Sequence, residues 1–101
     1  MADEIKADYE QLEKIAKSFH NQADEIQHME QQVRNGMHKL DPDWKGRGSK
    51  AFFHEMRGEV LPAVHRLHQA LQEASRVTKE IVQTMQQADE EASSPFKILS
   101  S

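Results

Sequence analysis

The sequence contains no cysteine, which excludes disulfide bonds, zinc–thiolate sites and thiol nucleophiles. Glycine (4), proline (3) and aromatic residues (6%) are scarce, so the composition typical of a sheet protein is missing. No apolar run approaches the roughly 18 residues that a membrane-spanning helix needs. The first residues lack the basic start and apolar core of a signal peptide. We therefore expect no stable membrane insertion and, if the protein is exported, no cleaved signal peptide.

The residues that are present are mainly good helix formers, in a chain of 101 residues, the length of a single domain. There are 17 acidic residues against 13 lysines and arginines, which gives a net charge of −4. A protein that binds a phosphate backbone needs a basic stripe, and this composition does not favour one. We expect no nucleic-acid partner.

Apolar or small side chains recur every three or four residues through the first forty positions. This spacing is the heptad pattern of a helix that packs lengthwise against another helix. It predicts a helix over residues 4–40, about 55 Å long. The positions on this stripe are Ile5, Tyr9, Leu12, Ala16, Phe19, Ala23, Ile26, Glu30, Val33, Met37 and Leu40.

A turn is expected at residues 41–46, because Pro42 disfavours a helical conformation at the residue before it. Asp41 or Asp43 is suited to cap the next helix, and we favour Asp43. Trp44 is the only tryptophan; its ring is placed to cover the end of the apolar seam, with Gly46 leaving room for the backbone beneath it.

The apolar stripe resumes after the turn and predicts a second helix over residues 46–90. Pro62 lacks the N–H that would bond to Gly58, so we expect a kink near 58–62; the alternative is two helices joined by a loop. The pattern ends at Pro95, and residues 93–101 are predicted to be a flexible tail after a single hairpin over 1–92. The second stripe consists of Phe53, Met56, Val60, Val64, Leu67, Leu71, Ala74, Thr78, Ile81, Met85 and Ala88.

The first helix has more apolar surface than one neighbouring helix can cover. Ile15 and Met29 lie one position off the stripe and widen it next to Phe19, Ile26 and Val33. On the line of Ile15 and Met29, Gly36 would permit the close approach of a partner helix. The predicted fold is therefore all-α, an antiparallel helical hairpin that dimerises into a four-helix bundle. The partner is either a second copy or another chain.

Nothing in the sequence favours catalysis. No nucleophile elbow or phosphate-binding loop is present, so we expect no enzyme activity, cofactor or small-molecule substrate. His65 and His68 are three residues apart, but no carboxylate has ligand spacing with both, and we expect no metal site. The histidines are predicted to be solvated surface residues, and the methionines Met29, Met37, Met56 and Met85 to fill the core. The alternative for the methionines is an adaptable partner-binding face.

The turn contains the triplet Trp44, Lys45 and Gly46, followed by an apolar segment over residues 51–53. Together with the chain length and the heptad helix on each side, this triplet resembles the WXG family of type VII (ESX-type) secretion substrates. The resemblance implies synthesis in the cytoplasm, secretion, and two kinds of partner: a WXG-type chain, identical or different, and the type VII secretion ATPase.

The resemblance also implies a C-terminal export pattern, which Met85, Asp89, Ala92 and Phe96 match in spacing. Many members of the family have a tyrosine at the position of Met85. In a head-to-tail pair of hairpins, the turn of one protomer would lie beside this pattern in the other, so that an ATPase would recognise only assembled pairs. The alternative function is that of an intracellular helical adaptor in which the Trp-x-Gly triplet is coincidental.

Overall fold

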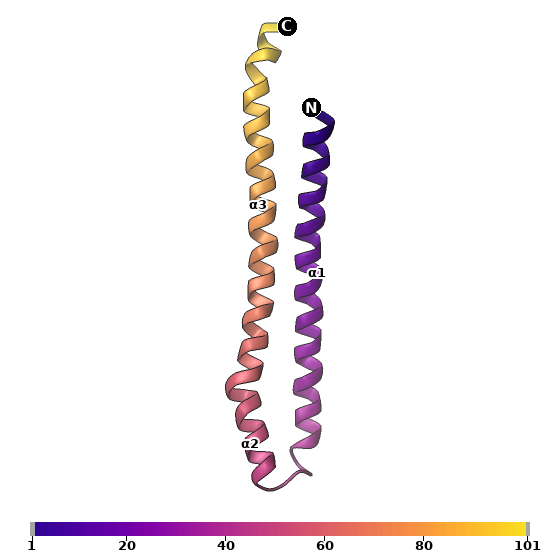
Figure 1. Ribbon diagram of the computed structural model, residues 1–101, viewed down its shortest axis with the longest axis vertical. Helices are drawn as coiled ribbons and strands as arrows, with labels where there is room; N and C mark the ends of the chain where they lie inside the picture. Colours follow the sequence, from indigo (N-terminus) through magenta and orange to yellow (C-terminus); the bar gives the residue numbers. More distant parts are fainter. Residues whose placement is uncertain (1, 101) are drawn as a thin grey trace.

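Two long helices lie side by side and run in opposite directions in the computed structural model, which describes the backbone of residues 2–100 and the side chains of residues 6–91 (Figure 1). Helix α1 spans Ala2–Leu40, and after the turn the chain continues as α2 (Arg47–Glu55), the π-helical segment η1 (Met56–Val60) and α3 (Leu61–Ser100). The molecule is a rod of 80 × 18 × 17 Å. The predicted all-α hairpin is confirmed, and residues 2–100 contain no strand.

The inner line of a helix is the row of buried residues that faces the other helix of the hairpin. In α1 it is the line that the sequence predicts. Every seventh residue is buried: Ala16, Ala23, Glu30 and Met37 are at most 7% exposed. The residues between them on the predicted stripe are half-buried: Tyr9, Leu12, Phe19, Ile26 and Val33. Leu40 is the exception at the end of the helix, with 42% of its surface exposed.

The inner line of α3 differs from the predicted stripe by one residue. The buried positions are Leu61, His68, Ser75 and Val82, whereas the predicted Val60, Leu67, Ile81 and Met85 are exposed. The other predicted positions in the middle of the helix are half-buried: Val64, Leu71, Ala74 and Thr78. Neighbouring helical residues are rotated by about 100°, so this shift turns the large apolar residues to one side of the contact with α1. Apolar periodicity misplaced the line because small and polar residues occupy it.

Two side-chain hydrogen bonds explain why polar residues occupy that line. Ser75 donates its hydroxyl to the carbonyl oxygen of Ala16 over 2.8 Å, and the Nδ1 of His68 lies 2.9 Å from the carbonyl oxygen of Ala23. The alanine side chains are short enough for α3 to approach these carbonyls. Since a carbonyl only accepts hydrogen bonds, Nδ1 of His68 is the donor. His68 is thus a buried residue, and its predicted place on the solvated surface was wrong.

Glu30 is the one charged residue on the inner line of α1. Its carboxylate accepts a hydrogen bond from Arg34 at 2.9 Å and lies 3.6 Å from Nδ1 of His65 in α3. The hydrogen bond from Arg34, together with the charge of that guanidinium and the contact with His65, lowers the pKa of Glu30 below its ordinary value of 4.5, although burial opposes the shift. The negative charge of Glu30 is therefore paired with Arg34 at the contact between α1 and α3.

The π-helical segment η1 lies where the sequence predicts a kink. The N–H of Leu61 bonds to the carbonyl of Met56, five residues back instead of four. The buried line steps eight residues from Phe53 to Leu61 and seven residues thereafter. The wider turn absorbs the extra residue just before Pro62, and no loop interrupts residues 47–100.

The last helix continues to Ser100, beyond the predicted end near residue 90, with Pro95 inside it. A proline within a helix removes one backbone hydrogen bond and bends the axis, and near a helix end few turns are affected. The side chains of the predicted tail, residues 93–101, lie outside the described ones, and its flexibility stays a prediction.

The Glu30 contact generates a pH-dependent prediction. Arg34→Gln should lower the free energy of unfolding by about 1 kcal/mol at neutral pH, because the buried carboxylate loses its closest cation. A carboxyl whose pKa is lowered on folding stabilises the fold above its unfolded pKa of 4.5, and this stability is lost as the pH falls through the folded pKa. The difference between wild type and variant in urea unfolding should therefore shrink below pH 4.5. A difference that stays constant with pH would contradict this account.

Candidate functional site

The turn is closed by backbone hydrogen bonds and not by the predicted aspartate cap. The N–H groups of Asp43 and Trp44 both bond to the carbonyl of Leu40, at 3.2 and 3.0 Å. The N-cap of α2 is Gly46, and no side chain caps this helix, so the prediction that Asp43 would do so was wrong. Asp43 contributes its backbone N–H to the turn after α1, and its carboxylate does not cap α2.

Trp44 is the centre of an aromatic cluster between the turn and α2. Its ring centroid lies 5.3 Å from that of Phe52 and 6.0 Å from that of Phe53, distances typical of tilted aromatic pairs. The carbonyl of Trp44 accepts a hydrogen bond from the hydroxyl of Ser49 at 2.8 Å. The ring packs partly buried against the core residues Met37, Phe53 and Leu61. Trp44 therefore joins the turn to the end of the hydrophobic seam.

Gly46 is required for its backbone conformation. Its φ of 117° and ψ of −172° lie in a region that residues with a side chain avoid. A Cβ at Gly46 would meet no atom within 4 Å, so the predicted close passage beneath the tryptophan ring does not occur there. The residue next to the ring is Gly48, where a Cβ would lie 3.7 Å from an atom of Trp44.

These two glycines provide a matched pair of substitutions. Gly46→Ala should lower the free energy of unfolding by about 1–3 kcal/mol, because alanine strains the turn at positive φ. Gly48→Ala should leave stability unchanged or raise it by less than about 1 kcal/mol, since the position is helical and the contact is an ordinary one. Urea unfolding at a fixed protein concentration measures both. Equal losses for the two variants would show that the tryptophan contact, and not the backbone, requires glycine.

The residues of the C-terminal export pattern lie at the opposite end of the rod from Trp44 (Figure 1). Met85 is 41% exposed, and the carboxylate of Asp89 accepts a hydrogen bond from the hydroxyl of Tyr9 in α1. Ala92 and Phe96 lie outside the residues whose side chains are described. One chain therefore does not bring the turn and the C-terminal pattern together. The contact of Tyr9 with Asp89 was not predicted, because 80 residues separate the two in sequence.

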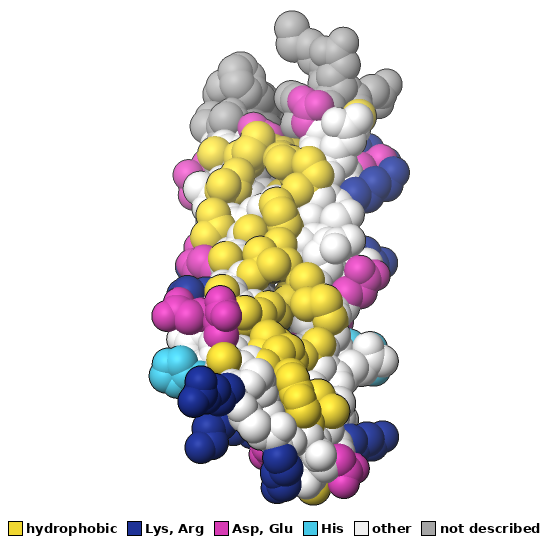
Figure 2. All heavy atoms as spheres, turned by 60° about the horizontal axis from the view of Figure 1, so that its bottom comes forward, with side chains coloured by type: hydrophobic (Ala, Val, Ile, Leu, Met, Phe, Trp, Pro, Cys, Tyr) yellow, Lys and Arg dark blue, Asp and Glu magenta, His cyan; other side chains and the backbone are white. Residues whose placement is uncertain are grey.

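A continuous apolar surface extends along one side of both helices (Figure 2). Of the predicted dimer face, Ile15 and Met29 are 46% and 42% exposed, whereas Phe19, Ile26 and Val33 are half-buried. The large exposed residues that heptad spacing places on this side are defined here as the apolar face: Ile15, Met29 and Leu40 from α1, and Phe52, Val60, Leu67, Ile81 and Met85 from α2, η1 and α3. Met29 and Met85 belong to this face and not to the core.

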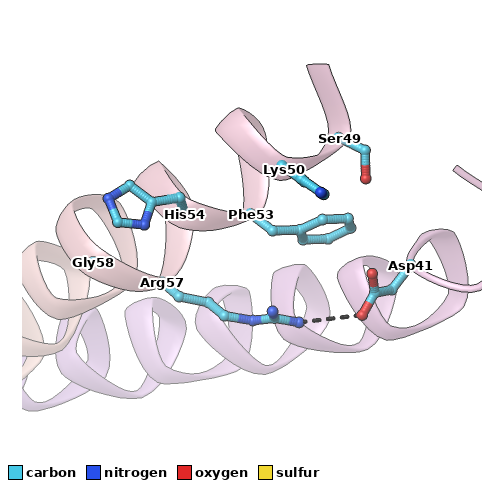
Figure 3. Close-up of a pocket in the computed structure, with 7 residues that line it drawn as sticks. All are labelled: Asp41, Ser49, Lys50, Phe53, His54, Arg57 and Gly58. Carbon is cyan, nitrogen blue, oxygen red and sulfur yellow. Dashed lines mark hydrogen bonds and ion pairs between the residues drawn. The ribbon is translucent and has the colours of Figure 1, made fainter. Parts of the chain in front are cut away.

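Two hollows flank the turn. One, of about 420 Å³, is lined by Leu40, Asp43 and Trp44. The other, of about 590 Å³, lies between the end of α1 and α2, where Lys50 and Arg57 lie on either side of the Phe53 ring and His54 also lines the hollow (Figure 3). Arg57 extends over the Phe53 ring, 5.1 Å from its centroid, and reaches Asp41 at 3.5 Å.

No group of three or more His, Asp or Glu residues within the described part of the chain is arranged to hold a metal ion. In the same part of the chain, no helix is long and apolar enough to cross a membrane.

The fold and the turn define a class of protein: a helical hairpin of about one hundred residues that reverses at a Trp-x-Gly turn. The family model described as proteins of 100 residues with WXG matches residues 4–90. The chain therefore belongs to the WXG100 family of type VII secretion substrates. Comparison with curated proteins and with solved structures gives no significant match.

Family membership places the protein among small helical proteins associated with type VII secretion. Members of the family are non-enzymatic, and they typically pair with other WXG proteins and with the secretion machinery. Their route of secretion is the type VII system.

Proposed function

We propose that the protein is exported by a type VII secretion system as a head-to-tail dimer of hairpins, in which the Trp44 turn of one protomer and the C-terminal pattern of the other form one recognition surface. The secretion ATPase would bind this composite surface. The observation that supports the proposal most directly is the apolar face, which a single WXG100 hairpin leaves in contact with water.

The apolar face is suited to pair with a second copy of itself. From Ile15 onward, its exposed residues follow heptad lines that continue through Gln22 and Gly36 in α1 and through Ala74 and Ala88 in α3, all of them uncharged. Asp8 is the charged residue at the start of the α1 line. A two-fold interface brings identical surfaces together, so an uncharged face avoids like-charge repulsion. No side chain of the same protomer lies within 4 Å of the site where a Cβ of Gly36 would be, which leaves that position open to a partner helix.

The distribution of charge supports the head-to-tail orientation. Residues 39–57, around the turn, include five lysines and arginines against three acids. Residues 6–13 and 79–91, at the other end, include two lysines and seven acids. Opposite orientation of the two protomers therefore brings the basic end of each beside the acidic end of the other, whereas parallel orientation would place like charges together.

Head-to-tail pairing also accounts for a composite signal. Trp44 and Asp89 are at opposite ends of one chain, but the turn of one protomer would lie beside Asp89 of the second. Tyr9 is hydrogen-bonded to Asp89 and so orients the carboxylate that the ATPase would read. The hollow beside Trp44 lies on the side of exposed Leu40 and would face the C-terminal end of the partner.

Self-association is tested by introducing charge into the apolar face. Wild-type protein should sediment as a dimer with twice the chain mass of 11.6 kDa. Ile81→Glu should be monomeric at the same micromolar concentration, since a carboxylate in an apolar interface loses its hydration. The matched control is Gln83→Glu, which adds the same charge to an exposed residue of α3 on the other side and should remain dimeric. A monomeric wild type, or dissociation of both variants, would contradict self-pairing through this face.

Export is tested by the amount of protein in the culture supernatant of a strain with a type VII system, with and without its ATPase. Trp44→Phe, Asp89→Asn and Phe96→Ala should each reduce export at least tenfold while the dimer persists, because each alters the recognition surface and not the apolar face. Glu91→Gln is the charge-matched control for Asp89→Asn and should be exported normally. Secretion that is unchanged in all three variants, or that does not depend on the ATPase, would overturn the proposed function.

A further inference from the structure

The groove between the end of α1 and α2 is lined by basic side chains that contribute little to the packing of the hairpin (Figure 3). Lys50 and Arg57 line it as exposed cations, and His54 lies between them along the helix. Within the described residues, Lys50 and His54 form no ion pair, and the one ion pair of Arg57 is the 3.5 Å contact with Asp41, beside its contact with the Phe53 ring. Positive groups thus outnumber negative ones in a hollow of about 590 Å³.

The groove lies on the side of α2 opposite to the apolar face. Phe52, which belongs to the apolar face, is two residues from Lys50 and two residues from His54. Two helical residues correspond to a rotation of about 200°, so both side chains project away from the side of Phe52. The groove therefore stays exposed when the apolar face is covered.

From this arrangement we propose that the groove binds an extended acidic peptide segment of another protein. Lys50 and Arg57 are separated by about 10 Å along the helix axis, at 1.5 Å per residue. In a polyproline II segment, residues three apart project from the same side and are separated by about 9 Å. Two carboxylates at that spacing would each meet one cation, and the Arg57 guanidinium, held over Phe53, presents a fixed donor to one of them.

A peptide fits this site better than a nucleic acid does. The chain has a net charge of −4. A third hollow adjoins the groove at Arg57 and is lined by Arg34 and His38, but Arg34 is paired with the buried Glu30, so the positive surface does not continue as an unpaired stripe. A long polyanion would meet net repulsion, whereas a short acidic segment contacts the cations alone. Asp41 is the one carboxylate in the groove, and it competes for Arg57.

The test is fluorescence anisotropy of a labelled peptide containing Glu-Pro-Pro-Glu, titrated with the full-length protein at low ionic strength. We expect saturable binding that Lys50→Gln weakens about fivefold, the upper range for one exposed ion pair. Asp41→Asn should tighten binding about threefold, because it removes a competing carboxylate and frees Arg57. Circular dichroism and sedimentation of each variant should match the wild type, since both residues are exposed.

Two controls separate a local site from general attraction. Lys79→Gln removes the same charge from an exposed residue near the far end of the rod and should change affinity less than about twofold. The peptide Gln-Pro-Pro-Gln should not bind. Equal weakening by Lys50→Gln and Lys79→Gln, an unchanged affinity in Asp41→Asn, or no saturable binding to the wild type would overturn the proposal. Because the readout needs neither export nor the secretion ATPase, its failure is distinct from a failure of the proposed function.

Discussion

The close contact between α1 and α3 at Ala16 and Ala23 determines the register of the hairpin and the rotation of α3. Where two helices approach over alanine, the side chains of Ser75 and His68 reach the carbonyls of the facing helix, and larger residues would hold the helices apart. These bonds set the register of the hairpin, because each polar side chain has one carbonyl within reach. These bonds also set the rotation of α3. With His68, Ser75 and Val82 on the inner line, the residues that precede His68 and Val82, which are Leu67 and Ile81, turn outward.

The outward rotation gives the hairpin two unlike sides. One side presents apolar residues along most of the rod (Figure 2), and the opposite side carries the groove lined by Lys50, His54 and Arg57 near the turn (Figure 3). A two-helix protein has too little interior to bury all of its apolar residues, so part of its hydrophobic surface is available for association. In this protein the seam is formed by small and polar side chains at Ala16, Ala23, His68 and Ser75 and by large apolar ones only near the turn and at Val82, so many of the larger apolar side chains are left exposed.

The turn and the π-helical segment align the buried residues of α2 and α3 with those of α1. Gly46 supplies a backbone conformation that other residues avoid, and Trp44 packs its ring over the seam where α2 begins. Phe53 and Leu61 are eight residues apart, one more than the later steps of the buried line. The π-helical turn η1 accommodates this extra residue. Without this wider turn, Phe53 and Leu61 would face different directions, and the core next to Trp44 would be incomplete.

The sequence by itself determined the helical hairpin, the position of its turn, the buried line of α1 and the family. Heptad spacing, Pro42 and the Trp-x-Gly triplet are local signals, and each acts through the geometry of one segment. The buried line of α3, the interior position of His68, the backbone role of Gly46 and the contact between Tyr9 and Asp89 were decided by the tertiary structure alone. The physical reason is that a wide apolar stripe allows several rotations of a helix. Only contact with the facing helix, through the carbonyls of Ala16 and Ala23, selects the rotation that places His68 and Ser75 inside and leaves Leu67 and Ile81 exposed.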